Sequence, residues 1–246
     1  MPAIARGFSP FALRAFLVFV LSAALHSAPA RADVITRLPT NEKVVALTFD
    51  ACEALIPVKL DHGIADYLVA RRIPFTIFMG GLFARDNAAD VKALATHDFI
   101  EIENHSYSHN NNMPSLSDAR VRSEVLRAQS EILKATGRLT HFFRFPAGHY
   151  DARTLSMVEA FGYRVVHWRW PEGDPDAEET ADMMVHRTLK TTEPGDILIF
   201  HINGRGVHTR EALPRIIDGL TAKGYRFVLL KDYLPPPLPA KNLPAG

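Results

Sequence analysis

The feature that most constrains this chain is a regular alternation of short apolar runs and longer amphipathic stretches. The apolar runs, each of strand length, occupy residues 44–50, 74–80, 99–105, 142–146, 163–170, 196–203 and 225–230. Strands that are apolar on both faces and separated by helices are typical of a parallel sheet covered on both sides. Seven such units favour a closed or nearly closed barrel. A doubly wound open sheet is the alternative.

Most of the gaps between the apolar runs carry a helical pattern, with apolar residues recurring on one face. The predicted helices span residues 58–72, 87–97, 117–137, 152–162, 179–192 and 209–224. One of them starts at Ser117, a good N-cap residue, and ends at Gly137, a residue type common just beyond a helix. With 246 residues, 47% of them hydrophobic, the chain can build one full core, so we predict a single domain.

The first 32 residues differ from the rest and are predicted to be a secretory signal peptide. Arg6 and Arg14 precede an apolar run at residues 15–25, and small residues end at a plausible cleavage point after Ala32. The run is too short to span a bilayer as a retained helix, so we expect no stable membrane anchor after cleavage. Removing residues 1–32 leaves 25 basic against 27 acidic residues, a balance that implies no nucleic-acid partner.

The remaining chain divides by composition into a lead-in at residues 33–43, the main domain at 44–232 and a Pro-rich tail at 233–246. Cys52 is the only cysteine, so no intramolecular disulfide can form. We expect an exported protein, periplasmic or secreted, that is stabilised by its core. The sequence does not indicate an oligomeric state.

Strongly polar side chains lie within or just after four of the apolar runs. Asp50 ends the first run and His105 the third, Arg144 lies inside the fourth, and His201 lies near the end of the sixth. Each would be costly to bury unpaired, by roughly 1–3 kcal/mol or more when charged. Because ligands of parallel α/β folds gather at the carboxyl ends of the strands, we expect these four to face one cavity.

A candidate metal site lies in the segment "HSYSH". His105 and His109 are four residues apart, where a strand gives way to a loop, and two imidazoles at that spacing can hold one divalent cation. The pair alone is a weak signal, and core packing of the histidines is the alternative. The position of the pair at a strand end favours the metal.

Taken together and in order, the segments "LTFDA", "HSYSH", "RFPAG" and "LIFH" resemble the polysaccharide deacetylases of the NodB-homology type, also called carbohydrate esterase family 4. The resemblance covers residues 44–230. It implies a distorted (β/α) barrel of about seven parallel strands and a metal-dependent hydrolase that removes N-acetyl groups, or sometimes O-acetyl groups, from glycans. Peptidoglycan, a chitooligosaccharide and an exopolysaccharide are the expected kinds of substrate.

The resemblance also implies roles for individual residues. Asp50 would be the general base, His201 the general acid, and His105 and His109 metal ligands. Arg144 would keep Asp50 ionised and oriented, since a neighbouring positive charge favours the carboxylate form. The backbone N–H of Ala147, the residue after the third-motif proline, would help to stabilise the oxyanion of the transition state.

The fourth motif of the family is less clear in this chain. In "WRWPEGDPD", Asp174 is the candidate to orient His201, because a carboxylate commonly fixes an imidazole; a turn-forming aspartate is the alternative. Trp168 could stack on a sugar ring or simply pack. Tyr150, just after "RFPAG", is a candidate substrate-binding residue, with loop packing as the alternative.

The chain departs from the family at Ala51, where the second aspartate of T-F-D-D would be the third metal ligand. Three substitutes compete. Glu53 is preferred because one carboxylate would replace another, giving a set of two histidines and a carboxylate that suits zinc, with cobalt or nickel acceptable. Cys52 could bind as a thiolate. Asp50 could itself be drawn onto the metal.

The same departure leaves a second class of function open, a degenerate member that binds glycan without hydrolysing it. Asp50, His201 and Arg144 argue against it, since a binding module has no need for both proton-transfer groups and the arginine. Hydrolysis of another amide on the same fold is a third alternative. The export signal favours an acetylated glycan over a small metabolite.

Overall fold

The structure is a computed structural model that describes residue 1 and residues 34–53 and 56–235. The predicted signal peptide at 1–32 lies outside the described residues apart from Met1, as does the tail from residue 236. The chain separates into two units, Met1–Arg31 and Ala32–Gly246. All of the helices and strands described here belong to the second unit.

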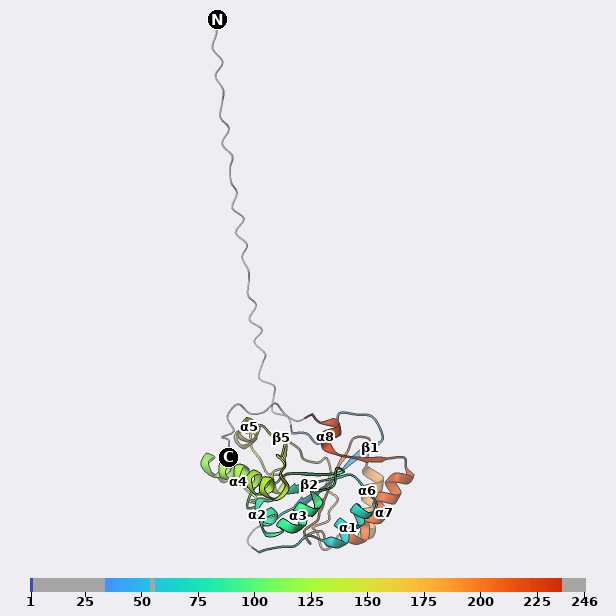
Figure 1. The fold of residues 1–246 in the computed structure, drawn as a ribbon. Helices are drawn as coiled ribbons and strands as arrows, with labels where there is room; N and C mark the ends of the chain where they lie inside the picture. Colours follow the sequence, from blue (N-terminus) through green and yellow to red (C-terminus); the bar gives the residue numbers. More distant parts are fainter. Residues whose placement is uncertain (2–33, 54–55, 236–246) are drawn as a thin grey trace. The chain divides into compact units, whose positions relative to one another are not determined.

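Seven parallel strands form one curled sheet in the described part of the chain (Figure 1). They are β1 (Val44–Ala51), β2 (Phe75–Met79), β3 (Ile100–Asn104), β4 (Phe142–Phe143), β5 (Arg164–Val165), β6 (Ile197–His201) and β7 (Arg226–Val228). The order is β5-β4-β3-β2-β1-β6, and β7 also pairs with β1. Ile35 bridges to Val166 and Arg37 to Asp196, so the lead-in segment connects the two ends of this order. The predicted distorted barrel is confirmed.

Eight α-helices accompany the strands in the described residues. They are α1 (His62–Ala70), α2 (Gly81–Asp86), α3 (Ala88–Leu94), α4 (Asp118–Thr136), α5 (Ala152–Ala160), α6 (Ala181–Thr191), α7 (Thr209–Ala222) and α8 (Leu230–Tyr233). Contacts link α4 to α2, α3 and α5, and link α7 to α1 and α6. Helices α2 to α5 therefore form one packed group and helices α1, α6 and α7 another, drawn toward the left and the right of the domain in Figure 1, with α8 apart from both.

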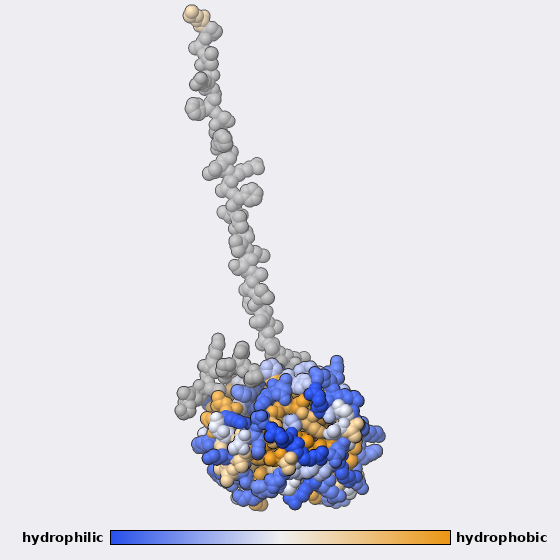
Figure 2. Space-filling model, turned by 45° about the vertical axis from the view of Figure 1, so that its right-hand side comes forward, coloured by the Kyte–Doolittle hydropathy of each residue, from blue (hydrophilic) through white to orange (hydrophobic). Residues whose placement is uncertain are grey.

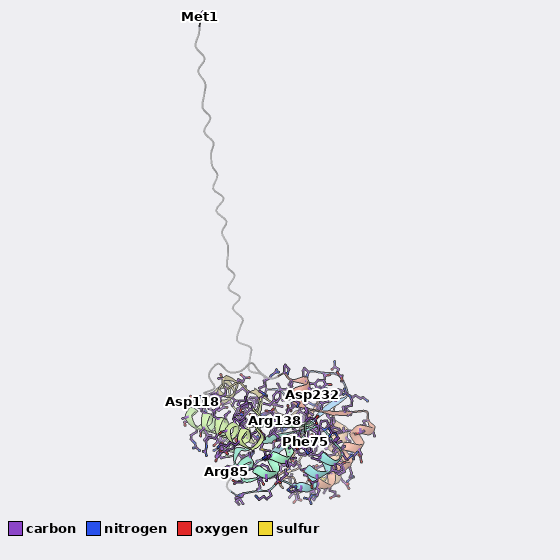
Figure 3. All side chains as sticks on the ribbon, viewed as in Figure 1. Met1, Phe75, Arg85, Asp118, Arg138 and Asp232 are labelled. Carbon is purple, nitrogen blue, oxygen red and sulfur yellow. The ribbon has the colours of Figure 1, made fainter. Side chains whose placement is uncertain are left out.

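The longest helix, α4, follows the sequence prediction closely. Ser117 occupies its N-cap position in an extended conformation, although its side chain makes no capping hydrogen bond. Gly137 ends it with a φ of 70°, a left-handed conformation that glycine adopts without steric cost. Figure 3 labels Asp118, the first residue of the helix, and Arg138, which lies just beyond its end. The helix packs on β3 and thereby supports the loop that follows this strand.

The alternation of side chains along β1 decides which residues can reach the inside of the barrel. Val45, Leu47, Phe49 and Ala51 belong to the core cluster that includes buried residues of α1, α3, α6 and α7. Val44 and Ala46 belong instead to a second cluster, formed with Phe78, Phe142 and Val228 of other strands. Because successive side chains of a strand point to opposite faces, the inner series continues through Thr48 to Asp50.

The surface of the folded unit mixes both kinds of residue. On the face drawn in Figure 2, hydrophilic residues border a hydrophobic area in the middle. Among the described residues other than Met1, the exposed large hydrophobic side chains are Ile56, Leu133, Leu139, Tyr150, Trp170, Met183 and Val207. Phe75, labelled in Figure 3, lies in the interior and is fully buried. Among the described residues, no helix has the length and apolar character needed to cross a membrane.

Candidate active site

The carboxyl end of β1 carries a buried ion pair. Arg144, which follows β4 and is fully buried, donates from Nη1 to Asp50 Oδ1 over 2.8 Å. Its Nη2 donates to Thr48 Oγ1 over 2.9 Å, and its guanidinium lies 3.9 Å from the centre of the Phe78 ring. The predicted pairing of Asp50 with Arg144 is thus present in the structure. It fixes the direction of the carboxylate inside the barrel.

His105, directly after β3, is fully buried and is held by one ring nitrogen. Its Nδ1 lies 2.8 Å from the carbonyl oxygen of Arg144. Since a carbonyl only accepts, Nδ1 must carry the proton, and in the neutral ring Nε2 then presents a lone pair. Nε2 has no hydrogen-bond partner, although Asp50 Oδ2 lies 3.3 Å away. A buried imidazole nitrogen left in this state is suited to bind a metal ion.

His109 lies in a loop whose backbone is anchored by Glu124 of α4. The buried Glu124 carboxylate accepts from Tyr107 N at 3.1 Å, from Ser108 N at 2.8 Å and from Ser108 Oγ at 2.7 Å. His109 itself has a φ of 51°, which is uncommon for a residue with a Cβ and is often found at functional sites. The loop brings the rings of His105 and His109 to a centroid distance of 4.9 Å.

Cys52, rather than Glu53, lies with the two histidines. Potential ligand atoms of Cys52, His105 and His109 are all within 4.8 Å of one another, and all three residues are buried. The Glu53 carboxylate instead accepts a 3.4 Å hydrogen bond from Val58 N and interacts with Asp86. The structure therefore does not bring together the preferred carboxylate and the histidines. Asn203 Nδ2 donates to the Cys52 carbonyl and so holds the backbone just after β1 against the segment that follows β6.

His201, the last residue of β6, is held by Asp174. Asp174 Oδ1 lies 2.9 Å from His201 Nδ1, and Oδ2 accepts from Thr209 Oγ1 at 2.9 Å and from the His201 backbone N–H at 2.5 Å. The aspartate is almost fully buried. These contacts place Asp174 where the sequence prediction expected it, with its carboxylate orienting the imidazole so that Nε2 is directed away from it.

The surroundings of Asp50 and His201 shift the pKa values of these two proton-transfer candidates in opposite directions. Without a bound metal, burial by itself would raise the pKa of Asp50, but the charges of a protonated His105 and of Arg144 outweigh it and lower the pKa to about 2. Burial would lower the pKa of His201, but hydrogen bonds with Asp174 and Cys52 raise it to about 10. At neutral pH, Asp50 is therefore a carboxylate and His201 an imidazolium. This is the pattern of a base and an acid in one site.

A cavity of about 230 Å³ connects these groups. Asp50, His109 and His201 line it, together with Ala147, Trp168 and Asp174. Ala147 adopts a φ of 53° in the turn after β4. Tyr150 is not among the lining residues; its ring stacks on Phe145 and meets His167 edge-on, and the side chain is partly exposed. The structure thus places Trp168 and Ala147 at the cavity and Tyr150 beside it.

Three residues near the site were missed by the sequence prediction. Glu124 anchors the histidine loop, and Glu172 lines the cavity with a carboxylate that accepts from Ile199 N at 2.9 Å. Burial raises the pKa of Glu172 well above its ordinary value. His167 stacks on Trp168, and burial lowers its pKa to about 3, so its ring is neutral. Only Glu124 could have been identified from the sequence, because it is an acid on the apolar side of a predicted helix.

Comparison with known proteins gives a consistent result. Residues 37–180 match the family model described as polysaccharide deacetylase. A peptidoglycan-N-acetylglucosamine deacetylase of Bacillus cereus is 29% identical over 203 residues, which cover 82% of this chain and 92% of the relative.

Solved structures of similar fold include both active and inactive proteins. A crystal structure of a peptidoglycan N-acetylglucosamine deacetylase superimposes with a TM-score of 0.74 at 26% identity, covering 81% of this chain and 92% of the other. A carbohydrate esterase family 4 pseudoenzyme from Bacillus anthracis gives a TM-score of 0.73 at 23% identity, covering 83% and 70%. At that identity, the second match shows the fold alone.

Proposed function

Because the chain belongs to the polysaccharide deacetylase family, we propose that it is a metal-dependent hydrolase that removes N-acetyl groups from an acetylated polysaccharide or oligosaccharide. The observation that carries the proposal is the pair of opposed proton-transfer groups. Asp50 and His201 line one cavity, the first tuned to stay ionised and the second to stay protonated. A protein that only binds glycan has no need for this pairing.

The residues beside the cavity fit a divalent cation. His105 Nε2 is buried without a hydrogen-bond partner, and His109 lies next to it. Two imidazoles and one further ligand form a set typical of catalytic zinc, and cobalt or nickel are acceptable alternatives. A cation held there would lower the pKa of water and polarise the acetyl carbonyl.

The remaining steps fall to the chain's own residues. Asp50, kept ionised by Arg144, takes a proton from the attacking water as the new C–O bond forms. His201 gives its proton to the sugar nitrogen as the C–N bond breaks, which releases acetate and a free amine. Asp174 keeps His201 protonated and oriented between turnovers. The backbone N–H of Ala147 is proposed to stabilise the developing oxyanion at the cavity wall.

The substrate class is supported by the relatives and by the chemistry of the acid. A relative and a structural neighbour are described as peptidoglycan N-acetylglucosamine deacetylases, which favours an N-acetylated glycan. An amide nitrogen is a poor leaving group unless it is protonated, so a well-held imidazolium such as His201 matters more for an N-acetyl group than for an O-acetyl ester. Trp168 lines the cavity, and we propose that its ring contacts the sugar.

Acetate release from N-acetylglucosamine oligomers tests the proposal directly. The protein would be assayed as purified, after complete chelation, and after zinc is restored, with O-acetylated xylan as the competing substrate. We expect activity on the N-acetylated oligomers that disappears on chelation and returns with zinc. Glycan binding without acetate release under any metal would identify a degenerate binding protein. Faster release from xylan would identify an O-deacetylase.

We also propose that the protein works outside the cytoplasm, on an envelope or extracellular glycan. The support is the sequence of residues 1–32, with its basic start, apolar run and small residues before Ala32. N-terminal sequencing of protein recovered from the periplasm or medium should find a start at or near residue 33. Intact protein confined to the cytoplasm would refute this proposal without affecting the enzymatic one.

A further inference from the structure

We propose that Cys52 is the third protein ligand of the metal, so that the centre consists of one thiolate and the imidazoles of His105 and His109. The inference rests on the proposed function only in that the metal is the one this function requires. It replaces the carboxylate that the family pattern and the sequence prediction both favoured. The structure carries it through three independent observations.

The first observation is proximity within a buried cluster. Cys52, His105 and His109 each offer a ligand atom, and these atoms all lie within 4.8 Å of one another. Side chains of Cys52 and His109 are less than one-tenth exposed, and His105 is fully buried. The three donor atoms come from two loops. At these separations, a small movement of the side chains would allow all three to bind one ion.

The second observation is the orphaned nitrogen of His105. Its Nδ1 is committed to the Arg144 carbonyl, and its Nε2 is buried with no hydrogen-bond partner. Buried polar atoms have a hydrogen-bond partner in the large majority of cases, so this exception needs an explanation, and a role in binding an ion provides one. In metal sites, the histidine nitrogen that does not bind the metal usually donates a hydrogen bond, which fixes the tautomer of the ring. The bond from His105 Nδ1 to the Arg144 carbonyl has this arrangement. The free lone pair therefore points to a ligand independently of the cysteine.

The third observation is where the chain places the alternatives to Cys52. Ala51, the last residue of β1, has no donor atom and belongs to the core cluster beneath the helices, on the face opposite to Asp50. Cys52 lies just beyond the end of the strand and is buried. Glu53 is buried as well, but its carboxylate meets Val58 and Asp86. Of these three positions, only position 52 has a donor atom beside the two histidines.

The ligand set has consequences for the metal. A thiolate with two imidazoles favours zinc or cobalt over magnesium, calcium or manganese. Three protein ligands leave a fourth position, as in catalytic zinc sites. His109 lines the cavity shared with Asp50 and His201, and it also lines a second cavity shared with Cys52 and Arg205. The cluster is therefore reachable from solvent on the side where the reaction is proposed to occur.

Cobalt spectroscopy of the reduced full-length protein tests the inference without any activity measurement. A cobalt–thiolate bond gives an intense near-ultraviolet charge-transfer band, and the chain has a single cysteine, so the band can only come from Cys52. We expect one cobalt per chain with this band. One bound cobalt without the band overturns the inference, and absence of any cobalt binding overturns both the inference and metal dependence.

Two variants sharpen the test. Cys52→Ser should lose the band and weaken zinc binding. Removing a residue that only hydrogen-bonds to a metal ligand typically weakens binding roughly 10- to 100-fold, and we expect a larger loss here. The matched control, Glu53→Gln, should keep the band and the zinc affinity. The reverse pattern, with the band intact but zinc lost only in Glu53→Gln, would assign the site to the carboxylate. Urea unfolding of each variant shows whether the fold is retained.

The inference and the proposed function can fail separately. A cobalt–thiolate band in a protein that releases no acetate would leave the ligand assignment standing and refute the deacetylase. Zinc-dependent acetate release with no thiolate band in the cobalt form would do the opposite.

Discussion

Replacing Arg144 tests whether the buried ion pair holds the site together. Arg144→Met keeps the length of the side chain and removes the charge, which leaves Asp50 buried without the partner it has at 2.8 Å. Removing one member of a buried pair usually costs about 3–5 kcal/mol, because the other charge stays desolvated and uncompensated. We expect a loss of that size in the free energy of unfolding at pH 7.

The double variant Arg144→Met/Asp50→Asn should recover part of the loss, since no unpaired charge remains. We expect a coupling energy of about 2–3 kcal/mol between the two positions. The control is Arg215→Met, which removes an exposed pair with Asp182 at 2.7 Å. An exposed pair contributes at most about 1 kcal/mol, so this variant should be almost as stable as the wild type.

The assay is urea unfolding of the metal-free protein, with the slopes compared to confirm a common unfolding transition. The pH dependence has a defined sign. Burial raises the pKa of Asp50 but the charges of His105 and Arg144 lower it from 3.8 to about 2, so the contribution of the pair is complete above about pH 4 and is lost as the pH falls through about 2. Additive effects of the two substitutions, or a loss as small as that of Arg215→Met, would refute the reasoning.

The remaining predictions concern the groups that position the site. Glu124→Gln should weaken zinc binding about 10- to 100-fold, because it loosens the loop before His109. The control Glu131→Gln, on the same helix, should leave zinc binding unchanged. Equal zinc affinities of the two variants in a competition titration would contradict this prediction. Asp174→Asn should move the basic limb of the pH–rate profile from near pH 10 to lower pH, because Asp174 contributes more than Cys52 to raising the pKa of His201. At pH 8.5 the loss should be at most about 100-fold, the value for a histidine of ordinary pKa 6.5, with Asp176→Asn as the unaffected control. An unchanged profile would mean that Asp174 does not tune His201.

Much of the fold could be predicted because the apolar runs of this chain are short, strong and regularly spaced. Each predicted strand exists, although the runs at 142–146 and 163–170 shorten to Phe142–Phe143 and Arg164–Val165. The other apolar residues of these two runs pack in loops that do not pair with a neighbouring strand. The apolar pattern of the sequence cannot distinguish such packing from strand pairing. Helix α2 was not predicted, because six residues directly after a strand show too little of a helical repeat.

The candidate site was predictable where a side chain ends a strand and unpredictable where it reaches across the fold. Asp50, His105 and His201 could be located from the strands alone, and Asp174 meets His201 as expected. The third ligand was assigned by matching chemical type, which favoured Glu53 over Cys52. The position of Cys52 could not be predicted from the strand repeat, because β1 ends at Ala51 and Cys52 lies just beyond it.

The contribution of Glu124 depends on how α4 packs against the loop after β3, a contact between residues 16 and 17 positions apart. Such contacts are set by the assembled fold, and the one local sign is that Glu124 lies on the apolar face of α4. The same holds for Glu172, whose burial in the cavity wall follows from the path of the segment before α6.

The most direct test of the proposed chemistry is the behaviour of Asp50→Asn loaded with zinc, because Asp50 is proposed as the base and the residues around it as the metal ligands. Acetate release from N-acetylglucosamine oligomers and zinc content would be measured on the same sample. We predict that turnover is abolished while zinc remains bound at one ion per chain. Retained turnover would show that Asp50 is not the base, and loss of the zinc would show that Asp50 is itself a ligand.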